Sequence, residues 1–82
     1  MLKLRDDLDF EILGEYGFKR DSMGYCYNLR LEDYTIFIWK YDNDTYYRSR
    51  YLYIELTQWT NLIYKGLDVL YKMVMDGVLI NG

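Results

Sequence analysis

The sequence predicts a small α+β protein with an N-terminal helix, an antiparallel β-meander of three to four strands, and a C-terminal helix packed on one face of the sheet. Apolar residues recur at helical spacing near both ends of the chain, and the segments between them alternate or are rich in β-branched and aromatic residues. The 82 residues suit a single domain spanning 1–82. Aromatic residues make up 20% of the chain, so a few large rings can build a core in a short sequence.

The first predicted element is an amphipathic helix over residues 4–13. Leu4, Leu8 and Ile12 are spaced four apart with acidic residues between them, which is typical of a helix with one apolar stripe. Either Gly14 or Gly17 is expected to end this helix in the left-handed conformation. Most of the excess negative charge of the chain lies in this segment.

Three segments predict the meander. Residues 25–31 alternate, which directs Tyr25 and Tyr27 toward the core and Cys26 to the other side as a buried small hydrophobe. Residues 34–41 are β-branched and aromatic, which favours a central strand covered on both faces. Residues 42–45 are expected to form a hairpin loop that leads into a strand over 46–56.

The C-terminal part of the chain predicts a second helix. Residues 57–66 leave strand, loop and helix open, whereas apolar residues return at helical spacing from Leu67. Gly77 is expected to end the helix. The apolar tail 78–80 is expected to pack down or to add a strand.

Composition argues against most catalytic chemistry. The chain has no histidine and one cysteine, Cys26, so the usual general base, the commonest zinc ligand and an internal disulfide are all missing. Asp42 and Asp44 resemble the start of a calcium loop, but the glycine and distal glutamate of that loop are absent. We therefore expect no catalytic, cofactor or metal site and no enzymatic activity.

The location and partners of the protein are also constrained. A lone cysteine and an N-terminus without a signal-peptide pattern favour a soluble protein of the cytoplasm. No run approaches the roughly 20 apolar residues of a membrane span, so we expect no membrane association. The net charge of −3 disfavours nucleic-acid binding, which depends on neutralising phosphates.

The tyrosines supply the candidate binding surface. In an extended strand over 46–56, Tyr47, Tyr51 and Tyr53 share a face with polar residues, which predicts exposure of rings that suit a protein interface. Alternatively, cross-strand tyrosine pairs simply stabilise the meander. The candidate protein-binding residues are Tyr47, Arg48, Arg50, Tyr51 and Tyr53, with Asp6, Asp7, Asp9 and Glu11 as an acidic flank.

Several motifs together resemble short uncharacterised proteins of phages and mobile elements. They are Glu15-Tyr16-Gly17-Phe18 after the opening helix, the tyrosine-rich meander, Leu67-Asp68-Val69-Leu70-Tyr71, and Asp76-Gly77-Val78-Leu79. The resemblance implies a protein that acts without catalysis, by binding and occluding a host enzyme as anti-CRISPR and other anti-defence proteins do. It transfers no binding residues.

Three functional hypotheses follow. The first is a non-catalytic protein-binding module with an unidentified protein partner. The second is a self-associating module, such as a homodimer formed through an exposed meander edge or the tail 78–80. The third is a single-stranded nucleic-acid binder that combines aromatic rings with Arg30, Lys40, Arg48 and Arg50.

Overall fold

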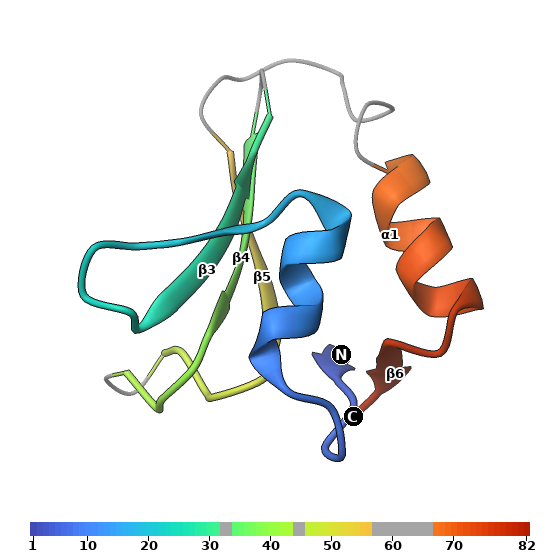
Figure 1. Ribbon diagram of the computed structural model, residues 1–82, viewed down its shortest axis with the longest axis horizontal. Coiled ribbons are helices and arrows are strands. Elements are labelled where there is room, and N and C mark those ends of the chain that lie inside the picture. The colour runs from blue at the N-terminus through green and yellow to red at the C-terminus, as the bar shows by residue number, and fades with distance from the viewer. Residues whose placement is uncertain (32–33, 44–45, 57–66) are drawn as a thin grey trace.

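A computed structural model describes residues 1–31, 34–43, 46–56 and 67–82. These residues contain both helices and antiparallel strands, which confirms the predicted α+β class (Figure 1). In chain order the elements are β1 (Leu2–Leu4), the 3-10 helix η1 (Phe10–Tyr16), β2 (Lys19–Arg20), β3 (Cys26–Arg30), β4 (Tyr34–Trp39), β5 (Leu52–Leu56), α1 (Leu67–Met75) and β6 (Leu79–Asn81).

The strands form two antiparallel sheets. The larger sheet has the order β2-β3-β4-β5, so that neighbours in sequence are neighbours in space. The predicted meander is matched in part, because β3, β4 and β5 fall in the predicted segments whereas β2 was not predicted as a strand. The smaller sheet pairs β1 with β6, with Leu4 opposite Leu79, and brings the two ends of the chain together (Figure 1). The tail beginning at Val78 therefore adds a strand, which is one of the two alternatives that the sequence predicted for it.

Strand register divides the four-stranded sheet into two faces. Residues paired across antiparallel strands point to the same side, and the side alternates along each strand. The core side carries the row Tyr27, Ile38 and Leu52. The opposite side, called here the outer face, carries the row Asn28, Phe37 and Tyr53 and the pair Cys26 and Trp39.

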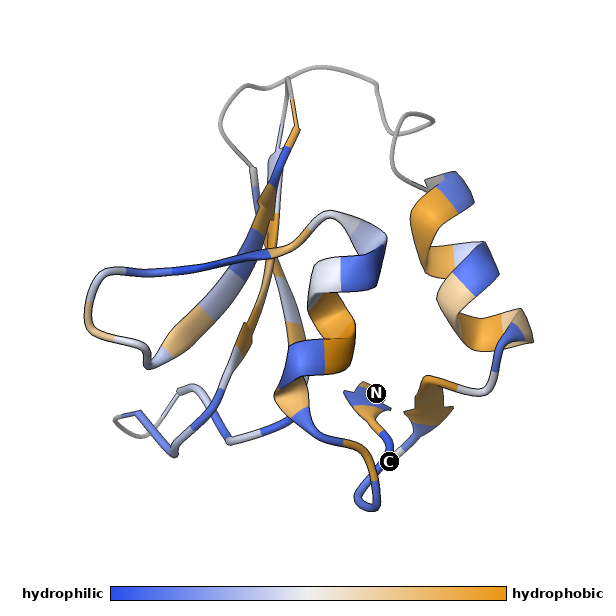
Figure 2. Ribbon diagram, viewed as in Figure 1, coloured by the Kyte–Doolittle hydropathy of each residue, from blue (hydrophilic) through white to orange (hydrophobic). Residues whose placement is uncertain are grey.

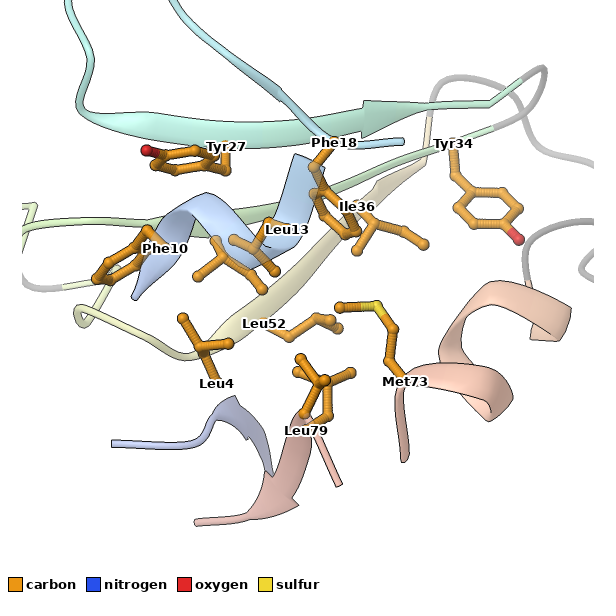
Figure 3. Packing of buried hydrophobic residues seen from close by; sticks show 12 residues of the cluster. Leu4, Phe10, Leu13, Phe18, Tyr27, Tyr34, Ile36, Leu52, Met73 and Leu79 are labelled. Carbon is orange, nitrogen blue, oxygen red and sulfur yellow. The ribbon is translucent and has the colours of Figure 1, made fainter. Parts of the chain in front are cut away.

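The hydrophobic core lies on one side of this sheet, where η1, α1 and the β1–β6 pair gather (Figures 1 and 2). Figure 3 shows side chains from all these elements meeting the sheet. Helix α1 packs mainly against β6 and reaches the core through Met73, so its predicted packing on the sheet is only partly matched. Among the described residues, the largest fully buried side chains are Leu4, Leu13, Ile36, Ile38, Met73 and Leu79.

The predicted helix over residues 4–13 is wrong in its first half. Leu4 belongs to β1 and is buried from a strand, and its amide donates to the carbonyl of Arg50 at 2.7 Å. The helical turns begin after Asp9, whose side chain accepts a hydrogen bond from the Glu11 amide at 3.0 Å as an N-cap. The apolar spacing of four does not reflect one helix. Leu4 in β1 and Leu13 in η1 come from different elements, but both are buried in the same core.

Both helices end in the glycine conformation that the sequence predicts. Gly17 and Gly77 have φ angles of 93° and 75°, in the left-handed region that glycine adopts without steric cost. The following residues, Phe18 and Val78, are buried and donate their amides to carbonyls five positions back. This is the Schellman arrangement, which satisfies the last carbonyls of a helix.

The predicted strand over 46–56 is correct only for its last five residues, Leu52–Leu56. The preceding residues form turns because other groups take their hydrogen bonds. The amide of Ser49 donates to Asp42 Oδ1 at 2.7 Å, and Arg50 has a φ of 75° that no regular strand accommodates. The hairpin prediction at 42–45 falls partly, and the open segment 57–66 entirely, outside the described residues.

The remaining strand predictions are confirmed with shorter bounds. The segments 25–31 and 34–41 contain β3 and β4. Tyr27 is buried as expected, whereas Tyr25 precedes the strand and is 46% exposed. In the part of the chain that the structure describes, no helix is long and apolar enough to cross a membrane.

Candidate functional site

The outer face of the four-stranded sheet carries a cluster of aromatic rings, Phe37, Trp39, Tyr47 and Tyr53, called here the aromatic face. Phe37 and Trp39 are two apart on β4 and therefore point to the same side. Tyr53 lies opposite Phe37 on β5, and Tyr47 comes from the turn region before β5. Among the described elements, both helices lie on the other side of the sheet (Figure 1).

The rings of the aromatic face hold one another in place. Phe37 stacks on Tyr53, and Trp39 stacks on Tyr47, each with ring centroids 5.9 Å apart. Tyr47 meets Phe37 and Tyr53 edge to face at 5.3 and 4.9 Å. Each such pair contributes roughly 0.5–1.5 kcal/mol beyond burial of its area, so the contacts favour this arrangement of the four rings.

Backbone hydrogen bonds position the turn that carries Tyr47. Its amide and carbonyl both pair with Asn43, at 3.1 and 2.8 Å. The amide of Arg48 donates to the hydroxyl of Tyr53 at 2.9 Å, which ties the turn to β5. Two aromatic residues of the cluster are thereby fixed by the same short segment.

Two grooves open on this side of the molecule. The central groove has a volume of about 310 Å³ and crosses β3, β4 and β5. The end groove has a volume of about 450 Å³ and lies where β4 runs into the following turn. Trp39 lines both grooves. The central groove is lined by Cys26, Asn28, Thr35, Phe37, Trp39, Tyr47 and Glu55, and the end groove by Tyr25, Trp39, Tyr41, Asp42 and Asn43.

The indole nitrogen of Trp39 is buried and, among the described residues, meets no hydrogen-bond acceptor. A buried donor without a partner costs roughly 1–3 kcal/mol.

Sequence reasoning missed Phe37 and Trp39 as site residues because it treated β4 only as a core strand. The alternation of Phe37, Trp39 and Tyr41 is the signal that marks them as one face.

The structure brings together only part of the predicted tyrosine row. Tyr47 and Tyr53 are in contact, but both are half-buried rather than exposed, because the turns before β5 fold the first ring onto the second. Tyr51 lies elsewhere. The guanidinium of Arg48 is 4.8 Å and the ammonium of Lys3 is 5.6 Å from its ring centroid. The expected single row of exposed tyrosines is therefore wrong.

Arg50 has a structural position on the core side of the sheet. Its Nη1 donates to the carbonyls of Arg5 and Leu8 at 2.8 and 3.0 Å, and its guanidinium lies 4.7 Å from the Phe10 ring centroid. Arg48, by contrast, is exposed. Because Arg50 is directed away from the outer face, it does not extend a basic stripe there.

The predicted acidic flank is not one helical surface. Asp6 and Asp7 lie in a turn after β1 and bond to Lys3 at 2.9 Å and to Arg5 at 2.6 Å. The hydrogen bond from Arg5 holds the pKa of Asp7 below its ordinary value. Both carboxylates are thus neutralised by neighbours in sequence.

The other two acids of the predicted flank have local roles. Asp9 caps η1. Glu11 accepts a hydrogen bond from the hydroxyl of Tyr27 at 3.1 Å, and it lies 3.8 Å from the guanidinium of Arg20. Both belong to the side of the sheet that η1 covers, so they do not flank the aromatic face.

Cys26 lies in the central groove and is buried, as the sequence predicts. Burial, assisted by the charge of Asp21, raises the pKa of the thiol to about 11. The thiol is therefore protonated and weakly nucleophilic at neutral pH. Within the described ranges, no group of three or more histidine, cysteine or acidic side chains could hold a metal ion.

Fold and site together define a small α+β protein that presents mutually packed aromatic rings and two shallow grooves on one side of its sheet. No protein-family model matches the sequence, and the comparisons with curated proteins and with solved structures found no match. The geometry of the aromatic face is therefore the basis on which a function can be proposed.

Proposed function

We propose that the protein is a non-catalytic binding module that grips a protein partner with its aromatic face and the two adjoining grooves. The observation that carries the proposal is the cluster of four interlocked rings on the side of the sheet opposite the core. Tyrosine and tryptophan are enriched at interface centres because they bring a large contact area at a small entropic cost.

The chemistry of the face supports binding rather than catalysis. The sequence lacks histidine, and the pKa of the Cys26 thiol in the central groove is raised to about 11, so neither common nucleophile system is at hand. A central aromatic cluster with a polar rim, here Asn28, Thr35 and Glu55, is the usual anatomy of a protein interface.

A comparison of two exposed tyrosines tests this proposal. Tyr41 lines the end groove and is 55% exposed, whereas Tyr71 lies on α1 and is 68% exposed. Tagged wild type, Tyr41→Ala and Tyr71→Ala are used to capture proteins from lysate of the cells that carry the gene. We expect a partner that Tyr41→Ala captures less than wild type and Tyr71→Ala captures equally. Equal capture by all three proteins contradicts the proposal.

The resemblance to phage and mobile-element proteins supports a narrower proposal. In it the partner is a host nucleic-acid-handling defence enzyme, which the protein occludes. Expression in a defended host should then restore the plating of a restricted phage, and Tyr41→Ala should reduce that restoration. Unchanged plating with wild-type protein against a panel of defence systems contradicts the narrower proposal and leaves the binding module intact.

Self-association is a second candidate, favoured by one observation on α1. Tyr71, Val74 and Met75 are exposed and lie three and four apart, which forms a stripe on the side of the helix away from the core. Val78 and Leu79 are buried within the chain, which favours α1 over the tail 78–80 as the contact surface. Light scattering at micromolar concentration tests it: a dimer that Val74→Lys dissociates supports it, and a monomer contradicts it.

A further inference from the structure

We propose that the partner contributes a basic segment, with an arginine or lysine side chain entering the central groove beside Glu55. This inference deepens the proposed function, on which it rests, by naming the chemistry of the partner. Two observations support it, namely the charges of the residues that line the grooves and the angles between the aromatic rings of the central groove.

Each groove combines aromatic rings with one carboxylate. Glu55 lines the central groove and Asp42 the end groove, and both residues are exposed. No lysine or arginine is among the residues that line either groove. In the end groove, Lys40 Nζ lies 5.7 Å from the Tyr41 ring centroid and Asp42 accepts a hydrogen bond from the Ser49 amide. The central groove is therefore the one whose charge a cationic side chain complements.

The rings of the central groove have the arrangement that attracts a cation. Phe37 and Trp39 are nearly perpendicular, at 87°, and Tyr47 is stacked on Trp39. A guanidinium or ammonium within about 6 Å of a ring centroid is attracted by the negative ring face, most strongly by that of tryptophan. Trp39 and Tyr47 are half-buried, so part of each ring remains open to the guest.

The chain already uses this interaction at other rings. Arg48 lies over Tyr51 and Arg50 over Phe10, with centroid distances of 4.8 and 4.7 Å. In the described part of the chain, no such intramolecular cation lies over the four rings of the aromatic face. These rings are therefore the ones left for a cation from another molecule.

Charges elsewhere on the outer face fix the direction of the segment. Register places Lys19 in the row of Asn28, and Arg30 in a row with Thr35 and Glu55. Arg30 and Glu55 are two strands apart, about 10 Å. The two basic residues repel a cationic segment from β2 and β3, and Lys40 Nζ, 5.7 Å from the ring centroid of Tyr41, is a third cation beside the end groove. The segment therefore lies along β4 and β5, with its cationic side chain between Glu55 and Trp39.

Peptide titration followed by NMR tests the inference. The probe is acetyl-Gly-Arg-Gly-Arg-Gly-amide, compared with the same peptide carrying citrulline, the same peptide carrying glutamate, and a short oligothymidylate. The readout is the indole resonance of Trp39, assigned with a Trp39→Phe variant. We expect the arginine peptide to shift the Trp39 indole resonance until binding saturates, and to bind more weakly at higher salt. The citrulline peptide should leave that resonance nearly unchanged.

A matched pair of charge variants completes the test. Glu55→Gln should weaken binding of the arginine peptide roughly two- to fivefold, the range of an exposed ion pair. Glu15→Gln, an exposed acid on η1, should bind as wild type does. Equal loss in both variants, or equal binding of the citrulline peptide, overturns the inference. If the Trp39 resonance responds more strongly to the glutamate peptide or to the oligothymidylate, the inference of a basic segment is overturned, although the aromatic face still binds a ligand. If no probe shifts the Trp39 resonance, the inference is also overturned, and the capture experiment alone decides the proposed function.

Discussion

Arg50 is the residue on which several segments converge. Its amide donates to the carbonyl of Trp39 at 3.0 Å, and its own carbonyl accepts from the amide of Leu4 at 2.7 Å. Its guanidinium bonds the carbonyls of Arg5 and Leu8. A left-handed φ of 75° is unfavourable for a side chain with a Cβ, and these contacts hold it there.

Substitutions at Arg50 separate side-chain contacts from backbone strain. Arg50→Ala removes both guanidinium bonds and keeps the strain, so we expect the free energy of unfolding to fall by roughly 2 kcal/mol. Arg50→Gly also loses the bonds but relieves the strain and should be about 1 kcal/mol more stable than Arg50→Ala. Urea denaturation followed by circular dichroism measures both. Exposed Arg48→Ala is the control, with a change within about 0.5 kcal/mol; a glycine variant no more stable than the alanine variant contradicts this account.

Cys26 offers a second test at the residue scale. Burial raises the pKa of its thiol from 9.0 to about 11, so at pH 8 the thiolate population is roughly 100-fold smaller than in the unfolded chain. We expect a disulfide reagent to react at least roughly tenfold more slowly with the folded protein than with protein in urea, because the higher pKa also makes each thiolate more nucleophilic and offsets part of the lost population. Similar rates in the two states would show that the central groove exposes the sulfur.

At the scale of elements, the hydrogen bond between Tyr16 and Asp76 joins η1 to the end of α1. The hydroxyl of Tyr16 donates to Asp76 Oδ2 at 2.7 Å, and Lys72 Nζ lies 3.3 Å from the same oxygen. The bond raises the pKa of Tyr16 to about 12 and lowers that of Asp76 below its ordinary 3.8. One polar contact thus links two helices that otherwise meet through the core.

The pH dependence of stability tests this link. Because the pKa of Asp76 is lowered in the folded state, its stabilisation is present above pH 3.8 and is lost as the pH falls through the folded value. Tyr16→Phe removes the largest cause of the shift, so its free energy of unfolding should fall less than that of wild type between about pH 5 and about pH 2. Tyr71→Phe, on the exposed side of α1, should follow wild type. Parallel curves for wild type and Tyr16→Phe would contradict the assignment.

Local patterns predicted the elements whose signals are local. The alternation around Tyr27 predicted β3, the β-branched and aromatic run predicted β4, and the glycines Gly17 and Gly77 marked the helix ends. The helix prediction was wrong for residues 2–4 because they form a strand by pairing with β6, at the other end of the chain. The spacing of neighbouring residues cannot reveal a pairing partner so far along the chain. The apolar residues at intervals of four, taken alone, favoured a helix.

At the scale of the whole molecule, the sheet has a packed core on one side and the aromatic face on the other. The sequence predicted a central strand covered on both faces, and Phe37 on the outer side is indeed only 7% exposed. Its covering rings, Tyr47 and Tyr53, were predicted to be site residues, but Trp39 was not. The turn that folds Tyr47 onto β4 depends on Arg50 and Ser49 contacts that alternation cannot show.

Site-specific photo-crosslinking in living cells tests the central claim most directly. A benzophenone amino acid replaces Tyr41, beside the end groove, or Tyr71, on α1, and mass spectrometry identifies the covalent adducts. The account predicts a discrete adduct with a protein partner from position 41 and none of that partner from position 71. The same partner captured from position 71 alone would contradict a binding surface on the aromatic face.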